Sequence, residues 1–244
     1  MSDVKVWRCI AWDERPTMNT RMWDPRVVIV TSIRLDEPPD RVVLDDDERL
    51  RAQRFVFDRD RRRFIAAHSA MRVTLGHHLG IAPEDVRFAT GARGKPYVTK
   101  ASRDVRFNLS HSGERALLAI TLGREVGVDI EQTRTVSDMF SVAERVFSVS
   151  ERERLRSTPA DRQHEVFFRL WTRKESFIKA LGEGMYFPLA EFEMSTDALG
   201  QQLLLSCAAA PHEMARWTTR ALDGEAGYTA AVTVEGGDFE VAQS

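Results

Sequence analysis

The chain has 244 residues, of which 43% are hydrophobic and 30% are charged, and its formal net charge is -2. This length allows one large domain or two small ones, and the near-neutral charge gives no global field that would attract nucleic acid or an anionic membrane. The cysteines, Cys9 and Cys207, fit no disulfide or metal pattern, and neither a signal peptide nor an apolar run of roughly 18 residues is visible, so we expect a cytoplasmic protein.

The first half of the sequence predicts strands around one long helix. Residues 1–25 contain prolines and scattered tryptophans, and we expect them to form an irregular N-terminal extension. A strand is predicted for residues 26–35, a short helix begins at the acids 45–47, and a long helix covers residues 58–80 and ends at its glycine. The other candidates are a hairpin around the turn GARG and three more strands, namely VRFNLS, ALLAITL and EVGVDIE.

The second half predicts two short helices, a long helix and four strands. Ser137 is the expected N-cap of the first short helix, and Ser150, followed by Glu153 in a capping box, is the expected N-cap of the second. The dipeptide at 158–159 predicts the start of the long helix, which runs to about Leu181 and is stopped by glycines. The four strand candidates are AEFEMS, QQLLLSC, RWTTRAL and YTAAVTV.

Together these elements predict an α+β fold. Each half contains a long helix and several strands that look antiparallel, so we expect two similar halves, each a long helix packed on a small, mainly antiparallel sheet. The N-terminal half would cover residues 26–123 and the C-terminal half residues 124–244. No repeat of roughly 20–50 residues is visible, so any duplication would be structural only.

The stretch G-V-D-I-E, residues 127–131, puts two acids on one face of a predicted strand. Residues two apart on a strand point to the same side, so Asp129 and Glu131 are neighbours, and Gly127 would leave room beside them. The ordinary explanation is the solvent-facing side of an edge strand. The functional interpretation is a Mg²⁺ site, because this hard cation prefers carboxylate oxygens and keeps several waters.

The stretch W-T-R-K-E-S-F-I-K, residues 171–179, aligns Trp171, Glu175 and Lys179 along one side of a predicted helix. A Glu–Lys pair at this spacing is common on exposed helices, where it contributes only about 0.2–0.5 kcal/mol. An apolar stripe beside the pair predicts that this helix is largely packed, which makes a surface pair a less complete explanation.

Three weaker motifs contain small polar or basic residues. In F-N-L-S-H-S-G, Ser110 and His111 could donate hydrogen bonds to a phosphate, although a hairpin turn with an incidental histidine explains the same letters. In G-K-P-Y-V, Lys95 lies in a turn before a strand. An arginine cluster at 59–63 suits a solvated helix face or a phosphorylated cofactor. The absence of a G-x-S-x-G elbow argues against a serine hydrolase.

The order GKPYV, FNLSHSG, GVDIE, FSVSE and WTRKESFIKALG resembles the Sfp-type 4′-phosphopantetheinyl transferases, from about residue 27 to about residue 232. The K-E-S form of the last motif is similar to the subgroup that includes the surfactin-type and heterocyst glycolipid-type transferases. The resemblance implies a pseudo-dimer of two α+β halves and a Mg²⁺-dependent enzyme, for which Mn²⁺ could substitute. It also implies transfer of the 4′-phosphopantetheine arm of coenzyme A to a serine of an acyl or peptidyl carrier protein, which releases adenosine 3′,5′-bisphosphate.

The resemblance also assigns roles to residues of this sequence. Asp129, Glu131 and Glu175 would hold the metal ion, Lys179 would face the phosphates, and Glu151, the acid of F-S-V-S-E, would be the catalytic base. The positions implied to contact coenzyme A are Lys95, Ser110, His111, Arg63 and Arg51. Coenzyme A contacts would then lie mainly in the N-terminal half, and the metal site and catalytic helix in the C-terminal half. We expect a monomer without nucleic acid or membrane partners.

Two alternatives stay open on the residues alone. A D-x-E motif followed by E-x-x-x-K also suits a metal-dependent nuclease or phosphohydrolase, although the chain has no broad basic stripe. The second alternative is a non-catalytic module that binds coenzyme A. Every implied catalytic position is occupied by a residue with the required chemistry, which favours an enzyme.

Overall fold

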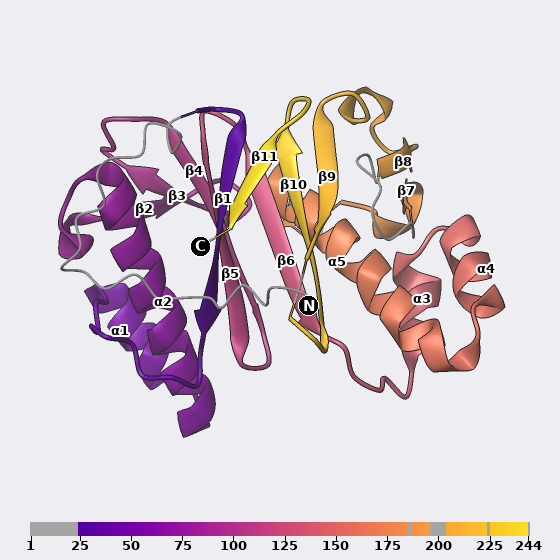
Figure 1. Ribbon diagram of the computed structural model, residues 1–244, viewed down its shortest axis with the longest axis horizontal. Helices are drawn as coiled ribbons and strands as arrows, with labels where there is room; N and C mark the ends of the chain where they lie inside the picture. The colour runs from indigo at the N-terminus through magenta and orange to yellow at the C-terminus, as the bar shows by residue number, and fades with distance from the viewer. Residues whose placement is uncertain (1–23, 185–186, 196–203, 224, 244) are drawn as a thin grey trace, which may run out of the picture.

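The computed structural model describes residues 24–184, 187–195, 204–223 and 225–243. These residues form a mixed α+β fold, in which two sheets lie in the middle and the helices cover their outer sides (Figure 1). The extension predicted at 1–25 lies almost wholly outside the described residues. Within the described residues, no helix is both long enough and apolar enough to cross a membrane.

The N-terminal half contains the predicted strands, hairpin and long helix. Its strands are β1 (Val27–Arg34), β2 (Arg87–Thr90), β3 (Pro96–Thr99), β4 (Val105–Ser112) and β5 (Arg115–Leu122). Its helices are α1 (Asp46–Gln53), α2 (Asp58–Leu79) and a short 3-10 turn at Pro83–Asp85. Asp45 caps α1 in a capping box with Glu48, and Gly80 ends α2 in the left-handed conformation that favours glycine. These elements confirm the prediction for this half.

The C-terminal half contains the rest of the predicted elements and one more strand. Its helices are α3 (Met139–Val146), α4 (Val149–Ser157) and α5 (Gln163–Leu181), with 3-10 turns at Ala160–Arg162, Leu189–Glu191 and Pro211–Glu213. Its strands are β6 (Val126–Gln132), β7 (Phe192–Met194), β8 (Leu204–Cys207), β9 (Trp217–Leu222), β10 (Tyr228–Glu235) and the unpredicted β11 (Glu240–Gln243). Residues 201–203 of the predicted strand QQLLLSC lie outside the described residues.

Three predicted helix starts were wrong by a few residues. Asp138, not Ser137, precedes α3, and its side chain makes no capping hydrogen bond. Helix α4 is capped by Ser148 in a capping box with Glu151, whereas Ser150 and Glu153 lie inside the helix. Pro159 has an extended ψ of 141°, so α5 begins only at Gln163, after a 3-10 turn.

The two sheets have the same strand order. In each half the chain runs through a first strand, a long helix, a short hairpin and two further strands, and the last strand lies between the other two. The orders are β1-β5-β4 and β6-β10-β9, and all these pairs are antiparallel. Strand β11 departs from this pattern, because it pairs in parallel with β1 and so extends the first sheet with the end of the chain.

Strand β6 has one apolar face and one face that carries acids, and its residues alternate between these faces as predicted. Val126, Val128 and Ile130 enter an apolar core between the two sheets. The opposite face carries the acids and contacts α5. A Cβ atom on Gly127 would lie 2.1 Å from the Ser176 carbonyl oxygen, so this glycine allows the helix backbone to approach the strand. The space expected beside the acids is therefore filled by α5.

Candidate active site

A row of polar contacts joins the edge strands β4 and β6, where the two sheets meet. Ser110 Oγ donates to Asp129 Oδ1 over 2.8 Å, and Ser112 Oγ donates to Glu131 Oε2 over 2.6 Å. Farther along the strands, Asn108 Oδ1 accepts a hydrogen bond from the Val128 amide at 2.9 Å. The motifs F-N-L-S-H-S-G and G-V-D-I-E are therefore brought together by side chains rather than by a backbone ladder.

Helix α5 adds a lysine to this row. Lys179 Nζ lies 2.5 Å from Asp129 Oδ1 and 2.8 Å from Ser110 Oγ. Its side chain is 28% exposed, while that of Asp129 is buried. An ammonium has three N–H donors, so these two contacts leave one donor for another acceptor. Three separate sequence motifs thus converge on one ion pair that solvent can reach.

Asp129 is only partly satisfied by its neighbours. Its Oδ2 atom is buried and has no hydrogen-bond partner among the residues that the structure describes. Burial raises the pKa of Asp129 to about 7, Lys179 opposes this rise, and the charge of Glu131 adds to it. A buried carboxylate oxygen without a partner is costly, so this atom is suited to accept a cation or a proton.

Two further acids surround the same lysine. Glu175 is half-buried, and burial raises its pKa, an effect that Lys179 opposes and Glu131 increases. The three acids predicted to bind metal therefore share one region. In the described part of the chain, however, no group of three or more His, Cys, Asp or Glu side chains is arranged to hold a metal ion, and Lys179 is the cation that contacts Asp129.

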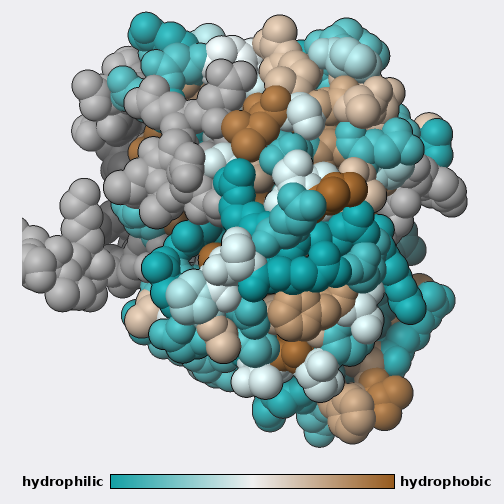
Figure 2. All heavy atoms as spheres, turned by 90° about the vertical axis from the view of Figure 1, so that its right-hand side faces the viewer, coloured by the Kyte–Doolittle hydropathy of each residue, from teal (hydrophilic) through white to brown (hydrophobic). Residues whose placement is uncertain are grey.

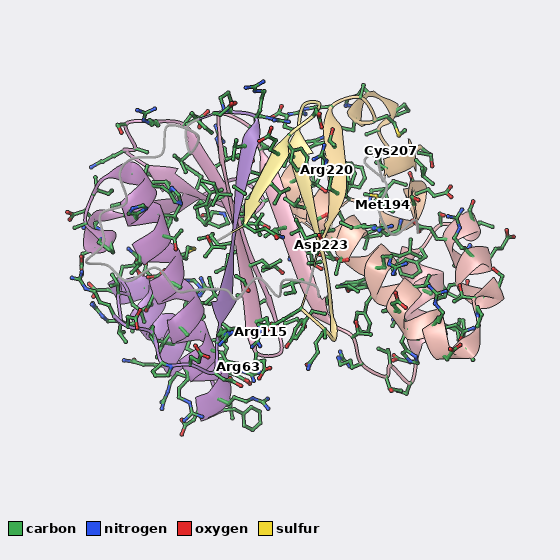
Figure 3. The ribbon with its side chains drawn as sticks, in the orientation of Figure 1. Arg63, Arg115, Met194, Cys207, Arg220 and Asp223 are labelled. Carbon is green, nitrogen blue, oxygen red and sulfur yellow. The ribbon has the colours of Figure 1, made fainter. Side chains whose placement is uncertain are left out.

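Basic residues from the N-terminal half extend the region. His111 is exposed, and the pKa of its imidazole is lowered first by desolvation and then by the basic groups of Lys179, His68 and Arg63, an effect that Glu131 opposes. Arg63 forms two contacts with Asp36, of 2.5 and 2.7 Å, and Glu114 also contributes to raising its pKa. Figure 3 shows Arg63 and Arg115 at the same end of the molecule. Lys179, His68 and Arg63 are thus close enough to His111 to act on its charge.

The other two basic residues predicted to bind coenzyme A lie in different surroundings. Lys95 Nζ contacts Glu125 Oε2 at 2.6 Å and the Ala180 carbonyl oxygen at 2.9 Å, and burial lowers its pKa. It therefore ties the β2–β3 hairpin to the end of α5, one residue beyond Lys179. Arg51 is exposed and lies 5.2 Å from the centroid of the Phe64 ring.

Glu151 does not join the polar row. Its side chain is 1% exposed and forms an ion pair of 2.8 Å with Lys174, which is equally buried. Its carboxylate also accepts hydrogen bonds from the amides of Ser148 and Met194, at 2.8 and 2.7 Å. A general base must reach the proton that it removes. The geometry therefore favours a structural role for Glu151 over the predicted role as catalytic base.

Sequence reasoning missed three residues of this arrangement. Asn108 and Ser112 alternate with Ser110 along β4, so the strand periodicity used for Asp129 and Glu131 would have placed them on the same face. Lys174 lies within the apolar stripe of this helix, and a buried lysine requires a partner that the sequence does not identify.

Comparison with known proteins gives matches across both halves. A family model described as "4'-phosphopantetheinyl transferase superfamily" matches residues 125–233, and one described as "4'-phosphopantetheinyl transferase, N-terminal" matches residues 41–122. The chain is 40% identical over 181 residues to 4'-phosphopantetheinyl transferase HetI of Nostoc sp., covering 71% of this chain and 76% of the relative. It is 32% identical over 158 residues to 4'-phosphopantetheinyl transferase Sfp of Bacillus subtilis, covering 65% and 69%.

The match to other proteins is less extensive. A putative 4'-phosphopantetheinyl transferase of Synechocystis sp. is 32% identical over 61% of each chain. The solved structure titled "Chronobacterium ammoniagenes ACPS-CoA complex" is 21% identical, covers 47% of this chain and 97% of that chain, and gives a TM-score of 0.36. A TM-score this low supports no argument about the site.

Proposed function

This chain belongs to the 4'-phosphopantetheinyl transferase superfamily as an Sfp-type enzyme, and from that premise we propose that it transfers the 4′-phosphopantetheine arm of coenzyme A to a serine of an acyl or peptidyl carrier protein. Adenosine 3′,5′-bisphosphate would be the second product. The observation that carries the proposal is the contact of Lys179 with both Asp129 and Ser110, because it joins all three motifs at one solvent-accessible point.

Phosphoryl-type transfer depends mainly on positioning and on neutralising charge, and the residues at this point suit both tasks. Lys179 would neutralise charge on the departing phosphate with its remaining donor. His111 would donate a hydrogen bond to a phosphate oxygen. Ser110 would exchange Asp129 for a phosphate, and Arg63 would exchange the half-exposed Asp36 for one. Lys95 and Arg51 are proposed to contact other parts of coenzyme A.

The carboxylate oxygens of this site are the donor type that a divalent metal ion prefers, although in the described part of the chain they are not arranged around one. We propose that Asp129, Glu131 and Glu175 hold Mg²⁺, or Mn²⁺ in its place. The buried Oδ2 of Asp129, which has no hydrogen-bond partner in the described part of the chain, supports this, and so do the two neighbouring carboxylates. A bound ion would neutralise pyrophosphate charge.

A carrier protein would need a docking surface near the site. We propose helices α3 and α4, because Val149 is 61% exposed and Phe140 is 43% exposed. Arg145 and Arg154 lie on the same two helices, and a carrier protein that is acidic around its serine would complement them. Figure 2 shows this side of the molecule, where hydrophobic residues are scattered among hydrophilic ones.

The internal organisation also supports a pseudo-dimer. We propose that residues 26–123 and 124–244 are structural repeats, since both sheets have the same strand order and each packs against a long helix. Such a chain would contain within one molecule the two halves that a dimer would supply, and would act as a monomer. A cytoplasmic location stays a prediction from the sequence.

Mass spectrometry of an apo carrier protein tests the proposal. After incubation with the enzyme, coenzyme A and Mg²⁺, the carrier is expected to gain the mass of one phosphopantetheine, and its serine-to-alanine variant is expected to gain none. No gain with several acyl and peptidyl carriers would overturn the proposal and favour a binding module. Cleavage of plasmid DNA under the same conditions would favour the nuclease alternative instead.

A further inference from the structure

A second carboxylate–lysine pair lies on the other side of α5, away from the polar row. Lys174 Nζ contacts Glu151 Oε2 at 2.8 Å, the Leu189 carbonyl oxygen at 2.8 Å and the Phe192 carbonyl oxygen at 2.5 Å. These three acceptors use all three donors of the ammonium. The ammonium also lies 4.0 Å from the centroid of the Phe192 ring. The ammonium therefore has no N–H donor left for a substrate.

The same pair connects three parts of the C-terminal half. Glu151 closes the capping box of α4 through the Ser148 amide and accepts from the Met194 amide of β7. Lys174 lies on α5 and holds the turn before β7. Its neighbour Arg173, also buried, donates to the Ser195 carbonyl oxygen. Helix α4, helix α5 and strand β7 are therefore fixed to one another through one pair of charges.

The connection through Glu151 and Lys174 also affects the side of α5 that carries the proposed catalytic residues. Glu175 directly follows Lys174, and Lys179 lies farther along the same helix, where Gly127 brings the helix backbone against β6. On the other side, Val149 of the proposed docking surface lies two residues before Glu151. The pair thus lies between the surface proposed to receive the carrier protein and the groups proposed to act on coenzyme A.

We propose that the Glu151–Lys174 pair is a positioning element, which holds the docking helix α4 and the catalytic helix α5 in register and takes no part in proton transfer. The proposal rests on the proposed transferase function for its activity measurements. It predicts that Glu151 matters because its charge balances that of Lys174. A catalytic base at this position would matter because it removes a proton, and the two roles give different results when both charges are removed.

Three variants separate these roles. Glu151→Gln leaves the Lys174 charge buried without a counter-charge, so its melting temperature should fall by roughly 10 °C and its kcat at least about 10-fold. The double variant Glu151→Gln/Lys174→Met removes both charges and should regain most of the melting temperature and of kcat. Lys174→Met keeps the carboxylate and should lose as much kcat as Glu151→Gln. The exposed Glu165→Gln on α5 is the matched control, and its kcat and melting temperature should not change.

The readouts are kcat, the carrier KM and the dissociation constant of coenzyme A, measured below the melting temperature of each variant. Loss of position should lower kcat and raise the carrier KM, while the affinity for coenzyme A stays within about 3-fold. A double variant that regains its melting temperature but stays as inactive as Glu151→Gln would overturn the proposal. If the double variant fails to fold, Lys174→Met decides: retained kcat overturns the proposal, and lost kcat supports it. A wild-type enzyme without transfer would instead refute the proposed function, and the melting temperatures would still test the charge balance.

Discussion

Helix α5 contributes one lysine to each of two lysine–carboxylate ion pairs. The two pairs differ in how many of their charged atoms have hydrogen-bond partners. In the pair of Lys174 with Glu151, both side chains are 1% exposed and each polar atom has a partner. In the pair of Lys179 with Asp129, the lysine is 28% exposed and one carboxylate oxygen has no partner within the described ranges. The first arrangement is complete without a ligand, whereas the second has capacity for one. The degree to which the charged atoms are satisfied, more than the presence of a charge pair, therefore distinguishes the pair proposed to be structural from the pair proposed to be catalytic.

The largest expected effect comes from removing the unsatisfied carboxylate. Asp129→Ala should lower the rate of phosphopantetheine transfer by about 10³-fold, because charge stabilisation at the phosphates is lost. The variant loses the contacts of Oδ1 with Ser110 and Lys179, but it also removes Oδ2, which is buried and has no partner among the described residues. Because these effects oppose each other and Lys179 keeps Ser110 and solvent, the melting temperature should change little. Transfer assays and thermal unfolding check both results. Activity near that of the wild type would show that the Asp129–Lys179 pair is not catalytic.

Lys179→Ala should have a smaller effect that is specific to turnover. We expect kcat to fall about 10- to 100-fold and the dissociation constant of coenzyme A to rise by less than about 3-fold, because the charge that Lys179 neutralises develops during the reaction. Steady-state kinetics and calorimetry measure the two quantities. Arg162→Ala, at the exposed start of the same helix, is the control and should change neither. Equal losses in kcat and affinity would indicate a binding role only.

A substitution in the surface next to the Glu151–Lys174 pair should affect binding of the carrier protein and not binding of coenzyme A. Val149→Asp should raise the carrier KM about 10-fold, because it places a charge in an apolar contact and repels an acidic partner. The affinity for coenzyme A should stay unchanged. Val42→Asp is a matched control, since Val42 is 63% exposed and Val149 is 61% exposed. Carrier kinetics that respond equally to both variants would remove α4 as the docking site.

The smallest effect concerns metal binding without substrate. Millimolar Mg²⁺ should raise the melting temperature by about 3 °C, because an ion that binds only the folded state stabilises it by mass action. The shift should disappear in Asp129→Asn and persist in Glu165→Gln. Thermal unfolding at matched ionic strength measures it. An equal shift in Asp129→Asn would show that the cation binds elsewhere.

The fold was largely predictable because its signals are local. The alternation in β6, the length of α2 and the glycine at the end of each long helix all follow from neighbouring residues. Strand β11 was missed, since its four residues pair with a strand from the beginning of the chain. The cap of α4 was misplaced because Ser148 and Ser150 are each followed three residues later by a glutamate. The contact of Glu151 with Lys174 and Met194 favours the first register, and local sequence does not contain that information.

The candidate site was predictable as a set of residues but not as an arrangement. Asp129, Lys179 and Ser110 were all named from sequence, and the structure brings them into direct contact. The burial of these side chains was less predictable than their identity. Glu151 and Asp129 are both acids in motifs of the same family. Only the fold reveals that Glu151 is enclosed by partners, whereas one oxygen of Asp129 has no hydrogen-bond partner among the described residues.

The pairing of β11 with β1 has a consequence for synthesis on the ribosome. Val27–Val30 leave the ribosome before the other described strands, but the backbone groups on one side of this strand bond with residues 240–243, which are made after all the other described strands. Until then, a strongly apolar strand presents open hydrogen-bonding groups, a condition that promotes aggregation. We therefore expect this segment to need shielding, by a chaperone or by transient non-native pairing, until β11 has been synthesised.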